Sequence, residues 1–189
     1  LRYGPAPRNW YHLCLPEAAP KGLAVIVHGG YWLRFSPDDF GHLATGALAR
    51  GWAVALPAYT LAPAARIAQI TAEIGAAVAA AAAAVAGPIR IAGHSAGGHL
   101  AARMVCADAP LPADVAGRIA HCLPVSPVAG SASESSASSP PCGRIGSGKA
   151  SEAQRGPCPG SLRELSELGQ VLLSARCRIT EGRVSVCGA

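Results

Sequence analysis

Ser95 stands at the centre of a G-x-S-x-G pattern that runs from Gly93 to Gly97. This pattern is typical of a nucleophile elbow, a sharp turn between a strand and a helix that holds a serine hydroxyl out toward solvent. Glycine relieves the crowding on either side of such a turn, and the start of the following helix favours developing negative charge. The spacing therefore predicts Ser95 as an acyl-transfer nucleophile. The other interpretation is a glycine-rich turn that carries a passive serine.

A second pattern, His28-Gly29-Gly30-Tyr31, precedes the serine in the chain. Acyl transfer needs backbone N–H donors directed at the oxyanion that forms, and glycine lets the backbone approach a substrate closely. We expect these donors to be the amides of Gly30 and Tyr31, together with the amide of Ala96 directly after the serine. Taken alone, the pattern also fits an ordinary Gly-Gly turn, but two patterns in this order favour an oxyanion hole.

Both patterns directly follow short apolar runs, Leu23–Val27 and Ile89–Ala92. Continuous apolar runs of this length are typical of strands buried in a parallel sheet. The remaining apolar spacing predicts further strands at 10–15, 52–56 and 119–125, and helices at 40–50, 67–85 and 96–107. Alternating strands and helices predict an α/β fold with a mostly parallel sheet and helices on both faces. The two patterns would then meet at the carboxyl ends of their strands.

The composition excludes several other classes of protein. Half of the 189 residues are apolar, 14% are charged, and the net charge of +5 is spread without a Lys/Arg run, so we expect no nucleic-acid partner. The alanine-rich run at 76–86 is too short and too weakly hydrophobic for a bilayer, and we expect no membrane partner. Seven cysteines without C-x-x-C spacing argue against disulfides and against a metal site. The expected protein is cytoplasmic, with a small-molecule substrate as its partner.

The composition changes abruptly after residue 129. Residues 1–129 contain three serines and every aromatic residue, whereas residues 130–189 contain twelve serines and four of the seven cysteines. The second stretch has no aromatic residue, histidine or aspartate. We therefore expect an incomplete core at 1–129 and a low-complexity, disordered tail at 130–189.

Three segments of the first stretch resemble a known family. They are V-H-G-G-Y-W at 27–32, Y-x-L-A-P at 59–63 and G-H-S-A-G-G-H-L at 93–100. Together they resemble α/β-hydrolases of the kynurenine formamidase and carboxylesterase branch, and the resemblance covers about residues 3–128. It implies a partial α/β-hydrolase fold and a serine hydrolase that acts on small aryl formamides or esters without a cofactor.

The resemblance also assigns residues to roles. It matches Ser95 to the nucleophile and the segment 28–31 to the oxyanion loop, with Gly93 and Gly97 supporting the elbow. Trp32 and Phe35, beside Tyr31, would line an aromatic substrate pocket; without the resemblance, core packing is the more natural role for these rings. His94 is expected to point into the sheet, and His99 to pack locally on the helix.

The sequence departs from this family in its catalytic triad. The family order is Ser, then Asp or Glu, then His, because a serine hydroxyl needs an imidazole to accept its proton. No histidine follows His121 and no aspartate follows Asp114. The alternative function is therefore a catalytically impaired fragment or a non-enzymatic binding module.

The residues after Val128 offer one explanation for the missing triad members. Read one nucleotide out of frame, the codons of 130–133 can spell Asp-Leu-Arg-Pro, which is similar to the family sequence at this point. We hypothesise that residues 130–189 result from a frameshift. An evolved low-complexity tail remains the alternative, and the nucleotide sequence across codon 129 distinguishes the two.

Overall fold

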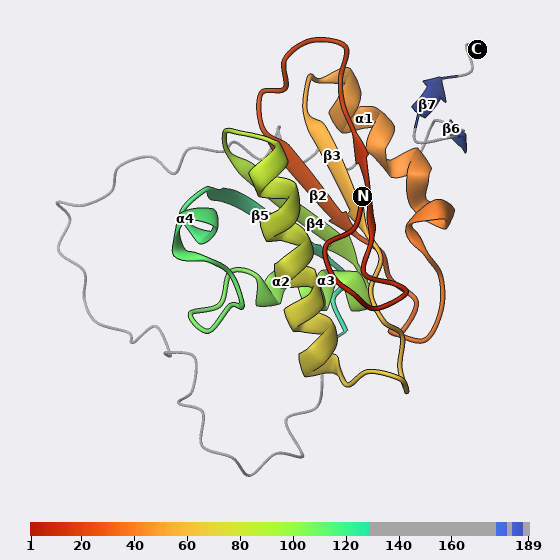
Figure 1. Cartoon of the computed structure of the whole chain (residues 1–189), viewed down its shortest axis with the longest axis vertical. Coiled ribbons are helices and arrows are strands. Elements are labelled where there is room, and N and C mark those ends of the chain that lie inside the picture. Colours follow the sequence, from red (N-terminus) through yellow and green to blue (C-terminus); the bar gives the residue numbers. More distant parts are fainter. Residues whose placement is uncertain (129–176, 181–182, 187–189) are drawn as a thin grey trace, which may run out of the picture.

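The computed structural model describes residues 1–128, 177–180 and 183–186 (Figure 1). Seven strands and five helical segments lie within these residues. The strands are β1 (Tyr11–Cys14), β2 (Leu23–Val27), β3 (Ala53–Pro57), β4 (Ile89–His94), β5 (Ile119–Val125), β6 (Cys177–Thr180) and β7 (Arg183–Val186). The helical segments are the 3-10 helix η1 (Pro37–Leu43) and the α-helices α1 (Ala44–Ala49), α2 (Ile67–Ala84), α3 (Ala96–Arg103) and α4 (Ala113–Ala116).

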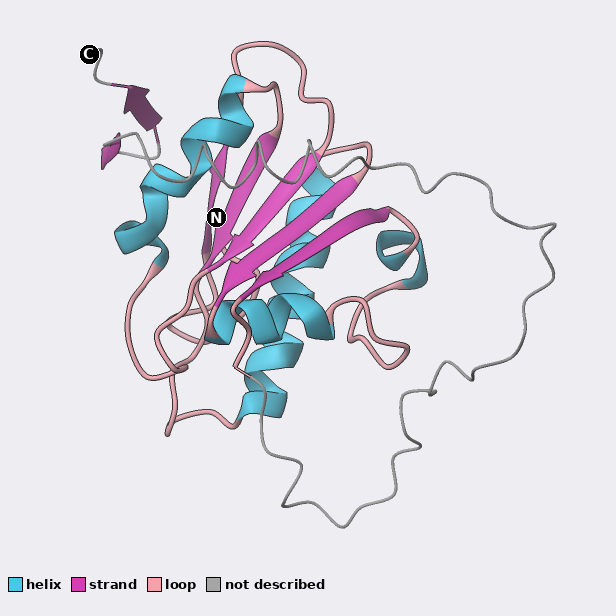
Figure 2. Cartoon of the chain, turned by 180° about the vertical axis from the view of Figure 1, so that it is seen from behind, coloured by secondary structure: helices cyan, strands magenta, loops and turns pink. Residues whose placement is uncertain are grey.

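Five strands form one mixed sheet in the order β1-β3-β2-β4-β5 (Figure 2). Strand β1 is antiparallel to β3, and the other neighbouring strands are parallel. The predicted α/β class with a mostly parallel sheet is confirmed. In the register of β2 and β4, Val27 lies opposite Gly93, so the segments that follow these two strands leave the sheet at the same edge.

The two faces of the sheet are buried by different helices. Val25 and Val27 pack with Ile70 of α2 and Leu100 of α3 in the larger apolar cluster. Val54 and Leu56 pack with the start of α1 in a smaller cluster. Residues that alternate along a strand point to opposite faces, and this alternation lets both sides of the short apolar strands be covered.

The predicted helix at 40–50 consists of two shorter pieces. The 3-10 helix η1 begins earlier, at Pro37, because Ser36 caps it: the Ser36 hydroxyl accepts from the Asp38 amide, and the Asp39 carboxylate accepts from the Ser36 amide. Helix α1 follows directly and ends before Arg50. The helix predicted at 96–107 ends at Arg103.

Helix α2 is the helix predicted at 67–85, and it extends beyond the alanine-rich run on its N-terminal side. It begins at Ile67, nine residues before Ala76, and its 18 residues are long and apolar enough to cross a membrane by length and composition; no other helix among the described residues is. Core helices of globular proteins meet the same criterion. Ile70, Ile74 and Val78 of α2 are fully buried against the sheet.

Of residues 130–189, the structure describes only the antiparallel pair β6 and β7. The predicted low-complexity, disordered tail otherwise lies outside the described residues.

Candidate active site

Ser95 lies on the turn between β4 and α3, in a backbone conformation that is unusual for its residue type. Its φ is 56° and its ψ is −119°, a region that residues with a Cβ rarely adopt. The conformation is fixed by hydrogen bonds: the Ser95 amide donates to the Val125 carbonyl (2.9 Å), and the Ser95 carbonyl accepts from His99 (3.1 Å) and Val128 (3.3 Å). The side chain is half-buried at the carboxyl edge of the sheet. This is the strand–turn–helix geometry of a nucleophile elbow.

Gly93 and Gly97 flank the serine where no side chain fits. A Cβ on Gly93 would overlap the carbonyl of Gly97, and a Cβ on Gly97 would lie 2.5 Å from the carbonyl oxygen of His28. The second contact shows that the start of α3 packs directly on the end of β2. Glycine at 97 therefore brings the serine and the segment after β2 together.

The segment after β2 passes beside the serine. A Cβ on Gly29 would lie 3.4 Å from the Cβ of Ser95 and 2.7 Å from the carbonyl oxygen of His94. The next three residues, Gly30, Tyr31 and Trp32, have φ values of 106°, 54° and 59°. From here on we use the name oxyanion loop for residues 28–35, which include the segment 28–31 that the resemblance matches to it. Its position beside Ser95 is the arrangement that the two sequence patterns predict.

The three predicted oxyanion donors have no acceptor among the residues that the structure describes. Among residues 1–128, no hydrogen bond is formed by the N–H groups of Gly30, Tyr31 or Ala96. Ala96 is the first residue of α3, and the first N–H groups of a helix have no partner inside it. Free donors on both sides of a serine can bind an oxygen that carries developing negative charge.

His28 is buried inside the fold, stacked between aromatic rings. It is 3% exposed, its ring stacks on Tyr59 with centroids 4.2 Å apart, and Phe40 lies 5.9 Å away on a nearly parallel plane. Burial lowers the pKa of His28 to about 4, so the ring is neutral at pH 7. Its Nδ1 lies 2.8 Å from the Gly29 carbonyl oxygen, to which a protonated Nδ1 donates. His28 thus supports the oxyanion loop from within.

The aromatic residues of the loop divide into two groups. Tyr31 and Phe35 are 61% and 44% exposed, whereas Trp32 is half-buried against the core. The Trp32 ring meets the His99 ring edge-on, with centroids 5.5 Å apart. Tyr31 and Phe35 are therefore available to a substrate. Trp32 combines core packing with a place next to the serine-bearing helix.

No histidine among the described residues is hydrogen-bonded to the Ser95 hydroxyl. His99 is half-buried, its Nδ1 has no partner among residues 1–128, and desolvation lowers its pKa. His94 corrects an expectation: it is exposed rather than turned into the sheet, because it is the last residue of β4 and lies at the open carboxyl edge. Residues 1–128 therefore bring together Ser95 and the amides predicted as oxyanion donors, and no histidine among these residues is hydrogen-bonded to the Ser95 hydroxyl.

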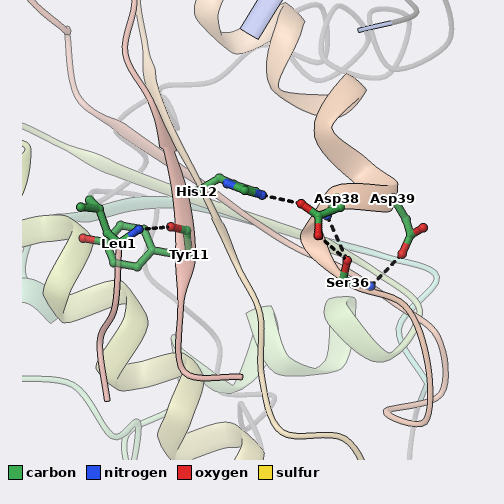
Figure 3. A network of polar contacts seen from close by, with 6 residues as sticks. All are labelled: Leu1, Tyr11, His12, Ser36, Asp38 and Asp39. Atoms are coloured by element: carbon green, nitrogen blue, oxygen red, sulfur yellow. Dashed lines mark hydrogen bonds and ion pairs between the residues drawn. The ribbon is translucent and has the colours of Figure 1, made fainter. Parts of the chain in front are cut away.

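A serine, an aspartate and a histidine do form a hydrogen-bonded network elsewhere, but their order differs from that of a catalytic triad (Figure 3). His12 Nε2 lies 2.7 Å from Asp38, and the Ser36 hydroxyl donates to the other oxygen of the same carboxylate (3.1 Å). The serine therefore contacts the acid and not the imidazole, so no base accepts its proton. This network joins β1 to η1.

Two residues of the site were not assigned roles by the sequence patterns. Tyr59 lies in the Y-x-L-A-P segment and contacts the start of the oxyanion loop through its hydroxyl. Arg8 binds the end of the same loop and belongs to no recognisable pattern. The motif pointed to Tyr59 without a role, and nothing in the sequence pointed to Arg8.

Comparison with known proteins agrees with this geometry. Residues 24–147 match a family described by the α/β-hydrolase fold. The chain belongs to the α/β-hydrolase fold family. Among curated relatives, this hydrolase-fold chain is 29% identical over 110 residues to the kynurenine formamidase of Danio rerio, a match that covers 56% of the chain and 38% of that protein.

Solved structures add two further relatives of the hydrolase-fold chain. A protein from Silicibacter sp. TM1040, provisionally assigned as a thioesterase, is 53% identical with a TM-score of 0.66; the match covers 67% of the chain and 48% of that protein. Esterase B from Lactobacillus rhamnosis is 22% identical with a TM-score of 0.52, over 64% of the chain and 42% of that protein, which shows the shared fold alone. The predicted similarity to the kynurenine formamidase and esterase branch is confirmed. The chain spans less than half of the length of each of these relatives.

Proposed function

We propose that the chain is the nucleophile-bearing part of a serine hydrolase that cleaves small aryl formamides or carboxylic esters through an acyl-enzyme on Ser95. The observation that carries the proposal is one juxtaposition. Ser95 stands in a left-handed conformation on the β4–α3 turn, against Gly29 of a loop whose next two amides have no acceptor among the described residues.

The chemistry follows from these positions. The Ser95 oxygen attacks the carbonyl carbon of the substrate and gives its proton to a water molecule, while the carbonyl oxygen becomes an oxyanion bound by the amides of Gly30, Tyr31 and Ala96. The tetrahedral intermediate collapses, the amine or alcohol takes up a proton and leaves, and an acyl or formyl ester remains on Ser95. Water then attacks this ester, releases the acid and restores the hydroxyl.

The preference for an aryl group rests on the exposed rings of the oxyanion loop. Tyr31 and Phe35 present exposed aromatic surface on the loop that passes Ser95 at Gly29, and the guanidinium of Arg34 lies 5.1 Å from the centre of the Phe35 ring. Aromatic rings bind one another in offset or edge-on arrangements. A planar leaving group is thus favoured over a long alkyl chain, in keeping with the kynurenine formamidase name of the Danio rerio relative.

Covalent labelling with a fluorophosphonate tests the nucleophile directly. We expect a single adduct by intact mass, mapped to Ser95, with no adduct on Ser95→Ala. Ser126 is a matched control, because it is an exposed serine at the same sheet edge and also has a positive φ (43°). Ser126→Ala should label at the wild-type rate, and labelling that persists in Ser95→Ala would refute the proposal.

The second candidate is an impaired hydrolase or a non-enzymatic binding module with the same pocket. It is favoured by one observation: no histidine of residues 1–128 is bonded to the Ser95 hydroxyl, and none follows His121 in the sequence. Enzymes of this type retain roughly 10³–10⁴-fold acceleration over water when a triad member is removed. Slow stoichiometric labelling of Ser95 without turnover of a nitrophenyl ester indicates an impaired hydrolase. Binding of aryl ligands without any labelling indicates a binding module.

A further inference from the structure

The oxyanion loop is held by one neighbouring segment at its start and in its middle. The Tyr59 hydroxyl lies 3.1 Å from the carbonyl oxygen of His28 and 3.4 Å from that of Gly29, and donates its single proton to this pair. Three residues further along, the Ala62 amide donates to the Trp32 carbonyl (2.8 Å). Both partners lie in the segment 59–63, which includes the Y-x-L-A-P pattern.

Arg8 holds the end of the loop to the same segment. Its Nε donates to the carbonyl of Tyr59 (2.7 Å) and its Nη2 donates to the carbonyl of Phe35 (2.6 Å). Among the described residues no carboxylate pairs with Arg8. The guanidinium therefore joins two main-chain carbonyls that are 24 positions apart in the sequence, and Tyr59 is common to both attachments.

The loop needs attachment because its backbone is strained. Tyr31, Trp32 and Phe35 all have positive φ values although each carries a Cβ. Such residues persist only where the surrounding structure fixes them, and they concentrate at functional sites. Tyr59 is well suited to fix them, since it is fully buried and stacked on His28, and burial raises the pKa of its phenol so that the hydroxyl remains a donor.

We propose that Tyr59 and Arg8 are positioning residues that clamp the two ends of the oxyanion loop, with Tyr59 setting the amides of Gly30 and Tyr31 against Ser95 and Arg8 setting Phe35 in the substrate pocket. The proposal deepens the proposed function and rests on it for its catalytic consequence. The two residues act on different steps, because Tyr59 fixes the oxyanion donors and Arg8 fixes the partly exposed ring of Phe35, which the proposed substrate would contact.

The experiment removes each attachment singly. Tyr59→Phe deletes only the hydroxyl, and Tyr3→Phe is its matched control, since the Tyr3 hydroxyl donates to the carbonyl of Ala58 (2.7 Å), one residue before Tyr59, without touching the loop. Arg8→Met deletes both donors and Arg8→Lys retains the charge. Arg2→Met is the arginine control, because Arg2 donates to local carbonyls of residues 4–6.

Two readouts are compared on the full chain. The first is the rate of Ser95 acylation by a nitrophenyl ester as a function of ester concentration, and the second is hydrogen–deuterium exchange of peptides that span residues 28–36. We expect Tyr59→Phe to lower the limiting acylation rate by roughly 10- to 100-fold at an unchanged half-saturating concentration, since small displacements of reacting groups have effects of this size. We expect Arg8→Met to raise the half-saturating concentration, Arg8→Lys to recover part of it, and both Tyr59→Phe and Arg8→Met to accelerate exchange of the loop.

The outcomes separate the two proposals. Acylation that depends on Ser95, combined with Tyr59→Phe and Arg8→Met variants that behave like their Tyr3→Phe and Arg2→Met controls, overturns the clamp and leaves the proposed function intact. If the wild type is not acylated at all, the proposed function fails, and hydrogen–deuterium exchange of the variants alone tests the clamp. Faster exchange confined to the loop in Tyr59→Phe and Arg8→Met supports a structural clamp, and unchanged exchange overturns it. Equal loss of thermal stability in Tyr59→Phe and Tyr3→Phe shows that fold damage does not explain a difference between them.

Discussion

Replacing Ser95 by glycine should stabilise the protein by relieving backbone strain. The comparison with Ser95→Ala separates this effect from the loss of the hydroxyl. Ser95 has φ 56° and ψ −119°, which glycine adopts without penalty and alanine does not. The serine side chain forms no capping hydrogen bond at the start of α3 and none to other described residues. Alanine therefore removes the hydroxyl while keeping the backbone strain, whereas glycine removes both.

The magnitude follows from two opposing contributions. A residue with a Cβ in a sparsely populated region destabilises the folded state by about 1–3 kcal/mol. Glycine also gains conformational freedom in the unfolded state, and this reduces the stabilisation from relieved strain by roughly 0.5–1 kcal/mol. The expected difference is about 1 kcal/mol in favour of Ser95→Gly over Ser95→Ala, or about 2–4 °C in melting temperature for a chain of this size.

The assay is calorimetric or urea unfolding of the wild type and both variants at one pH. Ser95→Ala should lie within about 0.5 kcal/mol of the wild type, as surface substitutions without a lost contact do. Neither variant should react with a fluorophosphonate. A glycine variant that is less stable than the alanine variant, as expected for an unstrained position at a helix start, would refute the claim that the serine is held under strain.

Three further predictions concern the surroundings of the site. Gly97→Ala should lower the free energy of unfolding by about 2–4 kcal/mol in urea titrations, because the added methyl would lie 2.5 Å from the His28 carbonyl oxygen in a closely packed site. Burial lowers the pKa of His28 from 6.5 to about 4, so the unfolded chain binds the proton more readily. Stability contributed by the neutral ring is complete above pH 6.5 and is lost as the pH falls toward 4; a His28→Phe variant should lose that part of the pH dependence, and identical pH profiles would contradict the assignment. Asp38→Asn should change stability by at most about 1 kcal/mol, since the His12–Asp38 pair is partly exposed; a double-mutant cycle with His12→Gln measures the coupling, and a larger value would show that the pair is more important than its exposure indicates.

The sequence predicted those parts of the site that depend on local chemistry. Glycine at 93 and 97 indicated crowding at the turn, and the apolar run before each pattern indicated which strands carry the serine and the loop. Parallel strands with aligned ends then had to bring Ser95 and Gly29 together, as they do. The turn and strand inferences depend on residues within a few positions of one another, and the meeting of Ser95 and Gly29 follows from the parallel pairing of β2 and β4.

The parts that could not be predicted depend on contacts between distant segments. Arg8 binds carbonyl oxygens of Tyr59 and Phe35, and every residue type carries such an oxygen, so no side-chain pattern marks the partner. The exposure of His94 depends on which segments cover the carboxyl end of β4, where this residue lies. The start of η1 at Pro37 depends on the Ser36 cap, which precedes the apolar spacing that was used to predict a helix.

The donors of the oxyanion loop belong to the main chain, while the side chains of Tyr31 and Phe35 extend into solvent. Under the proposed function, the main chain of this loop would bind the oxyanion and its exposed rings would bind the substrate, so the side chains could be varied without removing the main-chain donors. The left-handed backbone limits that freedom to residues that tolerate it. A library at 31 and 35 is best weighted toward asparagine, aspartate and glycine alongside the native rings.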